Sequence, residues 1–319
     1  MNIRMKEAFK LRAQTYADIR TFFQQQGFTE ADPPVLARTT IPESTIPAIS
    51  CRAGYLAGGP AQHKSKTDHS RLTLLPSPER YLKQLIAAGC GPLYSISHAF
   101  RNTEARTPHH AIEFTMLEWY LIHADHLHAL ESCRALMTHL LPGVQDRVMS
   151  MDEAFVECAG AQPGTAYSPV ALAALLRDNG MDARDDEAED DLFFRAFLGL
   201  VEPHLPSGAV YLVDYPTLIP SLAQPSAEGP WAQRWELYVD GIELANCYRE
   251  ERDTERIRTF MSGEFERMGR EPWDIEDIVQ DMSSMPPCSG VAMGIDRLLM
   301  LRGQYEDIGS VIISDYERR

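Results

Sequence analysis

Apolar residues near the start of the chain recur at helical spacing. Between residues 4 and 26 they fall close to every third or fourth position, at Phe9, Leu11, Tyr16, Ile19, Phe22 and Phe23. Such spacing predicts an amphipathic helix that buries one face, and Gly27 follows as a C-terminal cap. We therefore expect a long helix over residues 4–26.

The next segment, residues 28–36, contains Pro33 and Pro34 within a strand-like run. Proline has no backbone N–H to donate to a ladder and is confined to edge strands or bulges. The segment is therefore predicted to be an edge or interface strand and not a central one.

Glycine, histidine, lysine and serine dominate residues 51–70, which predicts a long loop. Loops of this length often act as lids. A short strand is expected over residues 71–75. Ser77 and Pro78 then suit the N-cap and the first position of a helix.

The pattern over residues 144–205 is mostly helical and includes an acidic run that we interpret as solvated surface. A further helix is expected over 295–301, and short strands are expected at 209–214, 235–244 and 290–293. Strands at both ends of the chain with helices between them indicate an α+β fold with an antiparallel sheet. We expect one domain over residues 1–319, with a helical insertion at 144–205.

Composition narrows the class of protein. The 319 residues, of which 44% are hydrophobic and 24% charged, suffice to bury a large core. The chain shows no signal peptide and no run of roughly 20 apolar residues, so a cytoplasmic protein without a membrane partner is expected. The six cysteines have no metal-like or disulfide spacing, which indicates reduced thiols. The formal net charge of -16 opposes the binding of tRNA.

Residues 100–120 combine a charged loop with an alternating strand. Arg101, Glu104 and Arg106 form a set that suits a triphosphate, since an Arg fork matches phosphate oxygens. After them, Phe114, Met116, Glu118 and Tyr120 share one face of the predicted strand. A β-hairpin with a solvated charged tip remains an alternative for this segment alone.

Residues 235–253 contain two carboxylates, Glu243 and Glu250, that suit a magnesium ion bound to nucleotide phosphates. Seven residues apart, they would lie on opposite faces of a regular strand. The strand must therefore break between them, and Asn246 and Cys247 are the candidate positions. A plain strand followed by a charged helix start is the alternative.

Residues 288–301 predict a strand that leads into a helix. Gly290, Ala292 and Gly294 leave one strand face bare, so that a flat ligand could approach the backbone. Arg297 falls in the first helical turn, where the helix dipole does not favour a positive charge. Stacking on a nucleotide ring and contact with phosphates would compensate for that.

Together, these segments resemble the three signature motifs of class II aminoacyl-tRNA synthetases, in the same order along the chain. "GFTEADPPVL" is similar to motif 1 with Pro34 as its proline, residues 100–120 resemble motif 2, and "GVAMGIDRLLML" resembles motif 3. The family implies an antiparallel sheet flanked by helices and a homodimer formed through motif 1.

The resemblance also implies roles for individual residues. Arg101 would grip the α-phosphate of ATP, Phe114 would stack on adenine, and Arg297 would cover the other face and the γ-phosphate. The remaining nucleotide contacts would come from Asn102, Glu104, His110, Leu244 and Gly294. Glu243 and Glu250 would bind Mg²⁺, and the amino-acid pocket would be lined by Ser77, Pro78, Glu79, Tyr120, Asn246, Glu250 and Ala292. Arg101, Glu243 and Arg297 would act by positioning and electrostatic stabilisation.

"EFTMLEWY", "GIELAN" and "GIDRL" are most similar to the lysyl branch of the family. The motif 1 helix begins close to residue 1, so we expect no anticodon-binding domain. The elongation factor P lysine ligases have that form, and "AAGCGPLYSISHAFRN" and "PPCSGVAMGIDRL" resemble them. This resemblance implies activation of lysine or (R)-β-lysine and its transfer to a lysine side chain of elongation factor P, with tRNA not expected as the acceptor.

Two departures from the family pattern keep other hypotheses open. Motif 2 is one residue longer than usual, with Ala111 and Ile112 in place of Asn-Pro, and Cys247 replaces a glycine. A paralogue that joins another amino acid to a carrier protein or to ammonia is one alternative. An inactive regulatory paralogue is another, although the retained Arg101, Glu243, Glu250 and Arg297 argue against it.

Overall fold

The computed structural model describes residues 3–52, 71–102, 107–184, 186–270 and 272–312. Contacts divide the chain into two compact units. Unit 1 comprises residues 1–122, 252–286 and 292–319, and unit 2 comprises residues 123–251 and 287–291. The predicted insertion at 144–205 lies within unit 2, whereas the prediction of one domain stays untested.

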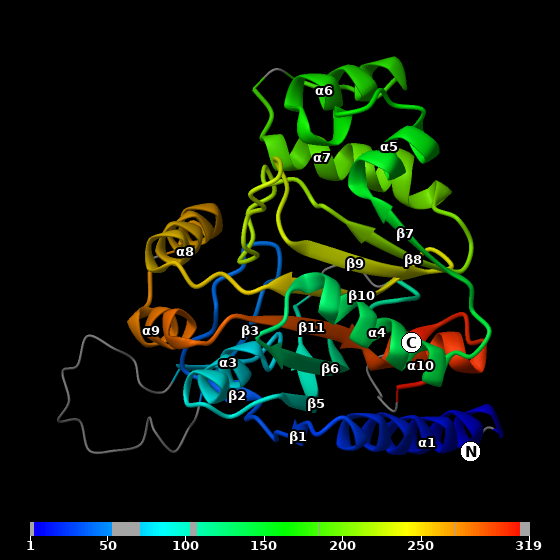
Figure 1. Ribbon diagram of the computed structural model, residues 1–319, viewed down its shortest axis with the longest axis vertical. Helices are drawn as coiled ribbons and strands as arrows, with labels where there is room; N and C mark the ends of the chain where they lie inside the picture. The colour runs from blue at the N-terminus through cyan, green and yellow to red at the C-terminus, as the bar shows by residue number, and fades with distance from the viewer. Residues whose placement is uncertain (1–2, 53–70, 103–106, 185, 271, 313–319) are drawn as a thin grey trace. The chain divides into compact units, whose positions relative to one another are not determined.

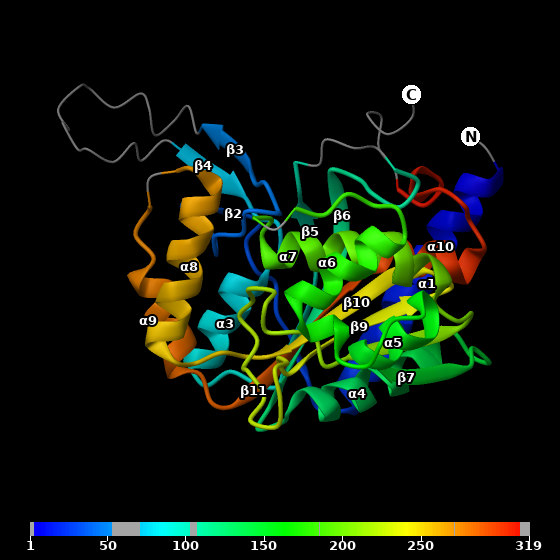
Figure 2. The same cartoon turned by 90° about the horizontal axis from the view of Figure 1, so that it is seen from above.

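Unit 1 contains a sheet with the strand order β1-β5-β6-β11, a three-stranded sheet with the order β2-β4-β3, and five α-helices within its described residues. The first sheet is formed by β1 (Thr29–Glu30), β5 (Leu93–Phe100), β6 (Glu113–Ile122) and the end of β11 (Cys288–Gly294). The second consists of β2 (Leu36–Ala37), β3 (Ile49–Arg52) and β4 (Arg71–Leu74). The helices are α1 (Ile3–Gln25), α3 (Glu79–Ala87), α8 (Thr254–Met268), α9 (Glu276–Ser284) and α10 (Ile295–Gly303), and a 3₁₀ turn, η4, spans Ile308–Ser310. Figure 2 shows α3, α8 and α9 side by side.

The predicted helix over residues 4–26 is confirmed as α1, and Gly27 ends it with a φ of 77°. A glycine is needed there because a side chain is strained at positive φ. The structure also explains how α1 is attached to the rest of unit 1. Arg12 pairs with the buried Asp296 of α10, and Asp296 accepts a 2.6 Å hydrogen bond from the amide of Thr115 in β6.

The prolines at 33 and 34 shorten the predicted strand over residues 28–36. Only Thr29–Glu30 and Leu36–Ala37 are strands, and β1 lies at the edge of its sheet, as predicted. Helix α3 begins at Glu79 with Pro78 as its N-cap, so the predicted N-cap at Ser77 was wrong by one residue. The Ser77 hydroxyl nevertheless accepts a 3.0 Å hydrogen bond from the Glu79 amide, which satisfies one donor of the first turn.

Unit 2 has the strand order β11-β10-β9-β8-β7, and helices cover the sheet. Its strands are β7 (Asp146–Ser150), β8 (Ala209–Val213), β9 (Arg234–Val239), β10 (Ile242–Arg249) and the start of β11. Its α-helices are α4 (His126–Leu140), α5 (Met151–Ala159), α6 (Pro169–Asp178) and α7 (Glu189–Ala196). The short turns are η1 (Thr165–Tyr167), η2 (Phe197–Val201) and η3 (Glu202–His204). The 144–205 segment is thus mostly helical as predicted, although it begins with the unpredicted strand β7.

Residues 235–244 were predicted to form one strand, and this was wrong. They form the hairpin of β9 and β10, because Asp240 and Gly241 turn the chain with φ values of 49° and 78°. Positive φ at both central residues is the requirement of the type I′ turn that an Asp-Gly pair favours.

The sheet is mixed and not purely antiparallel. The pairs β5/β6, β8/β9 and β9/β10 are antiparallel, whereas β1/β5 and β7/β8 are parallel. The fold is α+β, as predicted, because helices and strands do not alternate regularly. Strands β1 and β7 supply the parallel pairs because each leads into its neighbour by a crossover and not by a hairpin.

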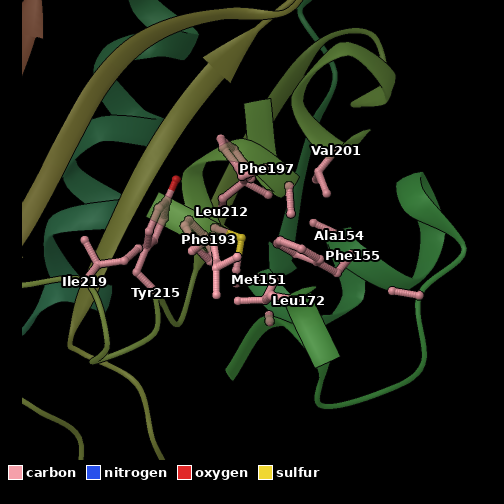
Figure 3. Packing of buried hydrophobic residues seen from close by; sticks show 14 of the residues in the cluster. Met151, Ala154, Phe155, Leu172, Phe193, Phe197, Val201, Leu212, Tyr215 and Ile219 are labelled. Carbon is pink, nitrogen blue, oxygen red and sulfur yellow. The ribbon is translucent and has the colours of Figure 1, made fainter. Parts of the chain in front are cut away.

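The two faces of β8 to β10 have different coverings within unit 2. Helices α5, α6 and α7 form an apolar core with one face, to which Leu212 and Tyr215 contribute together with Phe155, Phe193 and Phe197 (Figures 1 and 3). The opposite face packs against α4, where Trp235 donates a 2.7 Å hydrogen bond to the carbonyl of His126. The helical insertion therefore buries one face of the sheet over β8 and β9.

All six cysteines lie within the described residues and carry free thiols, as predicted. Among the helices of the described part of the chain, none is long and apolar enough to cross a membrane.

Candidate active site

The hairpin of β5 and β6 brings two predicted nucleotide contacts together in unit 1. Arg101 follows the last residue of β5, and Phe114 lies near the start of β6, opposite Ala99. The guanidinium of Arg101 lies over the Phe114 ring, 5.2 Å from its centroid. This is a cation–π contact, and it places a positive charge beside an aromatic ring, a combination that suits a phosphate and an adenine ring.

The position of Arg101 and a buried donor on its side chain also suit a phosphate. Its backbone amide donates a 2.9 Å hydrogen bond to the carbonyl of Ile112. Its Nε is buried and has no hydrogen-bond partner among the described residues. A buried donor of this kind needs an acceptor, and a phosphate oxygen would supply one.

The motif 2 loop contacts Arg297 in unit 1. Nε of Arg297 donates a 3.2 Å hydrogen bond to the carbonyl of His109, and its Nη2 lies 3.0 Å from Nε2 of His110. Burial, followed by the charge of Arg297, lowers the pKa of His110. A neutral His110 can accept from the guanidinium, so the unusual "HHAI" segment holds Arg297 at the start of α10.

Two further residues that were predicted to contact the nucleotide, Asn102 and Gly294, lie next to other residues of the site. The amide of Asn102 donates to the carbonyl of Pro47 at 2.8 Å. A Cβ at Gly294 would meet the side chain of Arg297 at 3.7 Å, so the two residues are adjacent. Glu104 lies outside the described residues, and its predicted role stays a prediction.

A buried carboxylate lies next to the predicted amino-acid contacts of unit 1. Glu118 is 3% exposed and accepts 2.7 Å hydrogen bonds from the hydroxyls of Ser77 and Tyr120. Burial, followed by the charge of Glu79, raises the pKa of Glu118 to about 8. Sequence reasoning placed Glu118 on the same strand face as Tyr120 but did not assign it to the site. Its position between two polar partners is visible only in the fold.

Glu79 pairs with the ammonium of Lys83, one turn later in α3. The Lys83 side chain is only 1% exposed, and a buried ammonium requires such a partner. The i,i+4 spacing in "ERYLK" was the available signal for this pair. Pro78 directly precedes Glu79 and sets the start of the helix that carries both residues.

In unit 2, a bulge sets the orientation of the residues of β10. The register with β9 shifts between Glu243 and Ala245, so the irregularity lies at Leu244. The predicted break at Asn246 or Cys247 was therefore wrong in position. An extra residue in one strand reverses the alternation of faces that follows it. Consequently Glu243 and Asn246 face the same side, and continued alternation brings Glu250 to that side.

Cys247 points the other way. It pairs with Trp235 on the face that α4 covers, and it is fully buried there. The replacement of the family glycine by Cys247 was the departure that left another amino-acid substrate open. The register instead directs the Cys247 side chain away from the face of Glu243.

The face that carries Glu243 also carries a buried polar cluster. Its centre is Glu236, which lies opposite Asn246 and pairs with Arg234. Glu236 also accepts hydrogen bonds from the hydroxyls of Tyr215 at 2.6 Å and Tyr238 at 3.0 Å. Sequence reasoning missed this cluster, although the alternation of Arg234, Glu236 and Tyr238 in "RWELY" was a signal of a polar strand face.

The described residues contain no group of three or more His, Cys, Asp or Glu side chains able to hold a metal ion. Magnesium prefers one or two carboxylates together with phosphate oxygens. The carboxylates of Glu243 and Glu250 share a strand face and fit that preference. Their predicted role as magnesium ligands therefore remains a proposal.

Comparison with known proteins agrees with this description. The family model of class II tRNA synthetases (D, K and N) matches residues 1–314, so the chain belongs to that family. Among individual relatives, "Elongation factor P--(R)-beta-lysine ligase" of Hamiltonella defensa is 33% identical over 315 residues, which cover 96% of this chain and 94% of the relative. The protein of that name from Yersinia pestis (strain Pestoides F) is 33% identical over 309 residues, covering 94% of this chain and 92% of the relative.

Proposed function

We propose that this chain is an ATP-dependent ligase that activates (R)-β-lysine or lysine and transfers it to a lysine side chain of elongation factor P. The observation that carries the proposal is the 33% identity to a ligase of that name over 96% of the chain. Unit 1 adds chemical support, because the buried Glu118 between Ser77 and Tyr120 suits the ammonium group of such a substrate.

The reaction would proceed in two steps. In the first, the carboxylate of the amino acid attacks the α-phosphorus of ATP, and pyrophosphate leaves. In the second, the amine of the acceptor attacks the activated carbonyl carbon, and AMP leaves. Neither step requires a nucleophile from this chain.

The residues of unit 1 would bind and orient the reactants. Arg101 would neutralise the α-phosphate, Phe114 would stack on adenine, and Arg297 would bind the γ-phosphate. His110 would keep the Arg297 guanidinium in place. Because these charges are positioned before the reaction, they stabilise the developing charge without reorganisation.

The carboxylates of unit 2 would bind magnesium, which neutralises phosphate charge when bound. Glu243 and Glu250 are the proposed ligands, and Asn246 is proposed to orient the amino acid. A cytoplasmic location is consistent with this proposal.

We also propose that the chain forms a homodimer through the segment around motif 1. Val35 and Leu36 are 36% and 38% exposed, and Phe9 of α1 is 60% exposed. These exposed apolar side chains are the observation that supports the proposed dimer.

The test of the function is amino-acid-dependent exchange of pyrophosphate into ATP. It should be measured with magnesium for lysine, for both β-lysine enantiomers and for the other amino acids, without an acceptor. Exchange that is strongest with (R)-β-lysine, followed by transfer to elongation factor P, is the expected result. Exchange with an amino acid that has no second amino group would refute the proposed substrate. No exchange with any amino acid would favour the inactive paralogue.

A further inference from the structure

An arginine of α1 reaches two other elements of unit 1. Nη2 of Arg12 donates to the carboxylate of Asp296 in the first turn of α10, and Nη1 donates a 3.2 Å hydrogen bond to the hydroxyl of Thr115 in β6. Nη2 also donates to the carbonyl of Val311 at 2.8 Å, and Nη1 to the hydroxyl of Tyr16 at 3.1 Å. Both terminal nitrogens of the guanidinium are therefore fixed by partners.

Asp296 and Thr115 are also joined to each other. The carboxylate of Asp296 accepts a 2.6 Å hydrogen bond from the backbone amide of Thr115. Asp296 and Thr115 are buried, and the Arg12 side chain is 18% exposed. A buried carboxylate needs an opposite charge and hydrogen-bond donors, and Asp296 receives both. Arg12, Asp296 and Thr115 thus form a closed ring of contacts, called here the Arg12 ring.

Two members of the Arg12 ring are direct neighbours of proposed nucleotide contacts. Asp296 precedes Arg297, and Thr115 follows Phe114. Successive residues of a strand point to opposite faces, so Thr115 lies on the face of β6 away from Phe114. Helix α10 packs against both β6 and α1. The Arg12 ring therefore joins the backbone that carries Arg297 to the backbone that carries Phe114, away from the face on which Phe114 lies.

The separation of these two segments matters for the proposed nucleotide site. Phe114 and Arg297 are proposed to contact the two faces of adenine, and such contacts depend on the distance between the two groups. The planar guanidinium of Arg12 presents two terminal nitrogens at a fixed separation. It can therefore hold a carboxylate of α10 and a hydroxyl of β6 at a set distance, whereas an ammonium is a single point charge.

We propose that Arg12 is a positioning residue that sets the separation of Phe114 and Arg297 and thereby the affinity for ATP. It acts through Asp296 and Thr115 and is not itself a contact of the nucleotide. The inference rests on the proposed function and deepens it, because it makes ATP binding depend on a residue of α1.

A second arginine in unit 1 provides a matched control. Arg302 of α10 donates a 2.8 Å hydrogen bond to the hydroxyl of Thr15 and a 3.1 Å hydrogen bond to the carboxylate of Asp18. Like Arg12, it joins α1 to α10 through one carboxylate and one threonine hydroxyl, and its side chain is 17% exposed. Within the described residues, however, its hydrogen bonds go to α1 and none goes to β6.

The test compares Arg12→Lys with Arg302→Lys. Each lysine keeps a positive charge beside its carboxylate but loses the second nitrogen that reaches a threonine. Pyrophosphate exchange should be measured with ATP varied at saturating (R)-β-lysine and the reverse, and the Kd for ATP should be measured by calorimetry without an amino acid. We expect Arg12→Lys to raise the KM and Kd for ATP by about 10-fold. Its KM for (R)-β-lysine, and all constants of Arg302→Lys, should change by less than about threefold.

Thr115→Val is a second test, because it removes the hydroxyl of the Arg12 ring and leaves the ion pair intact. It should also raise the Kd for ATP and leave the KM for (R)-β-lysine within about threefold. Unchanged ATP affinity in both Arg12→Lys and Thr115→Val would overturn the inference. An equal loss of ATP affinity in both arginine variants would overturn it too, since Arg12 would then only attach α1.

An equal rise in the KM for ATP and for (R)-β-lysine in Arg12→Lys would likewise contradict the inference, because it would mean a general loosening of unit 1. The Kd measurement separates the inference from the proposed function. If the wild-type chain binds ATP but exchanges with no amino acid, the proposed function fails, and the Kd values of the variants still decide the role of Arg12. A wild-type chain that binds no ATP would overturn both.

Discussion

At the scale of single residues, Glu118 shows that a carboxylate placed to bind a ligand can lower the stability of the folded chain. A carboxylate with 3% exposure and a pKa raised to about 8 is held at the expense of folding stability. Its hydrogen bonds from Ser77 and Tyr120 reduce that cost but do not remove it. Groups of this kind are typical of ligand sites, where the ligand supplies the missing charge.

We predict that Glu118→Gln stabilises the folded chain at alkaline pH. Since the folded-state pKa is raised from 4.5 to about 8, the stability contributed by Glu118 is fully present below pH 4.5 and is lost as the pH rises through 8. At one pKa unit per about 1.4 kcal/mol, and with allowance for relaxation, the gain at pH 9 should be about 2 to 4 kcal/mol.

Urea unfolding of both chains at pH 5 and pH 9 measures this effect. The difference between the chains should be below about 1 kcal/mol at pH 5 and should reach its full size at pH 9, while pyrophosphate exchange is lost. Glu266→Gln serves as the exposed control. The same difference at both pH values would mean that titration of Glu118 is not the cause.

The sequence predicted which residues belong to the candidate site better than it predicted which side chains they contact. Arg101, Phe114 and Arg297 were identified from their motifs, and the structure brings Arg101 to Phe114 and His110 to Arg297. The hydrogen bond from Ser77 to Glu118, in contrast, joins residues 41 positions apart along the chain. No local pattern encodes such distances.

At the scale of elements, β10 depends on a single extra residue. Without the irregularity at Leu244, Glu243 and Glu250 would face opposite sides of the sheet. The sequence indicated that a break was needed, because the spacing of the two carboxylates demanded it. The sequence did not indicate the position of this break, because Leu244, Ala245 and Asn246 include no residue type that favours a bulge. The turn at Asp240 and Gly241, which starts β10, was also overlooked.

We predict that the backbone at Leu244, and not its side chain, supports activity. The Leu244 side chain is 2% exposed, so Leu244→Ala should cost about 2 to 4 kcal/mol of stability yet retain pyrophosphate exchange within about threefold. Deletion of Leu244 should abolish exchange, because it turns Glu243 to the opposite face.

Exchange should be assayed at a temperature where circular dichroism shows both variants to be folded. Glu243→Gln provides the comparison, since it removes the same carboxylate without altering the register. A Leu244→Ala chain that is folded but as inactive as Glu243→Gln would contradict the assignment of the bulge.

At the scale of the whole molecule, charge distinguishes the possible acceptors. Proteins that bind nucleic acid obtain much of their affinity by neutralising phosphates with lysine and arginine. This chain has 30 such residues against 46 acidic ones, and many of its arginines form ion pairs, as in Arg147 with Glu157 and Arg258 with Glu276. The field of the molecule therefore opposes an incoming polyanion, although its family is named for tRNA synthetases.

We predict that the chain does not bind lysine tRNA at low ionic strength, where electrostatic attraction would be strongest. Fluorescence anisotropy of labelled tRNA at about 50 mM salt should show no binding at micromolar protein. AMP release with (R)-β-lysine should rise when elongation factor P is added and should not rise when tRNA is added. Binding to tRNA that weakens steeply with salt would reveal a basic surface that the net charge of -16 conceals. In that case the choice of acceptor would have to be explained by the geometry of the site instead of by the charge of the molecule.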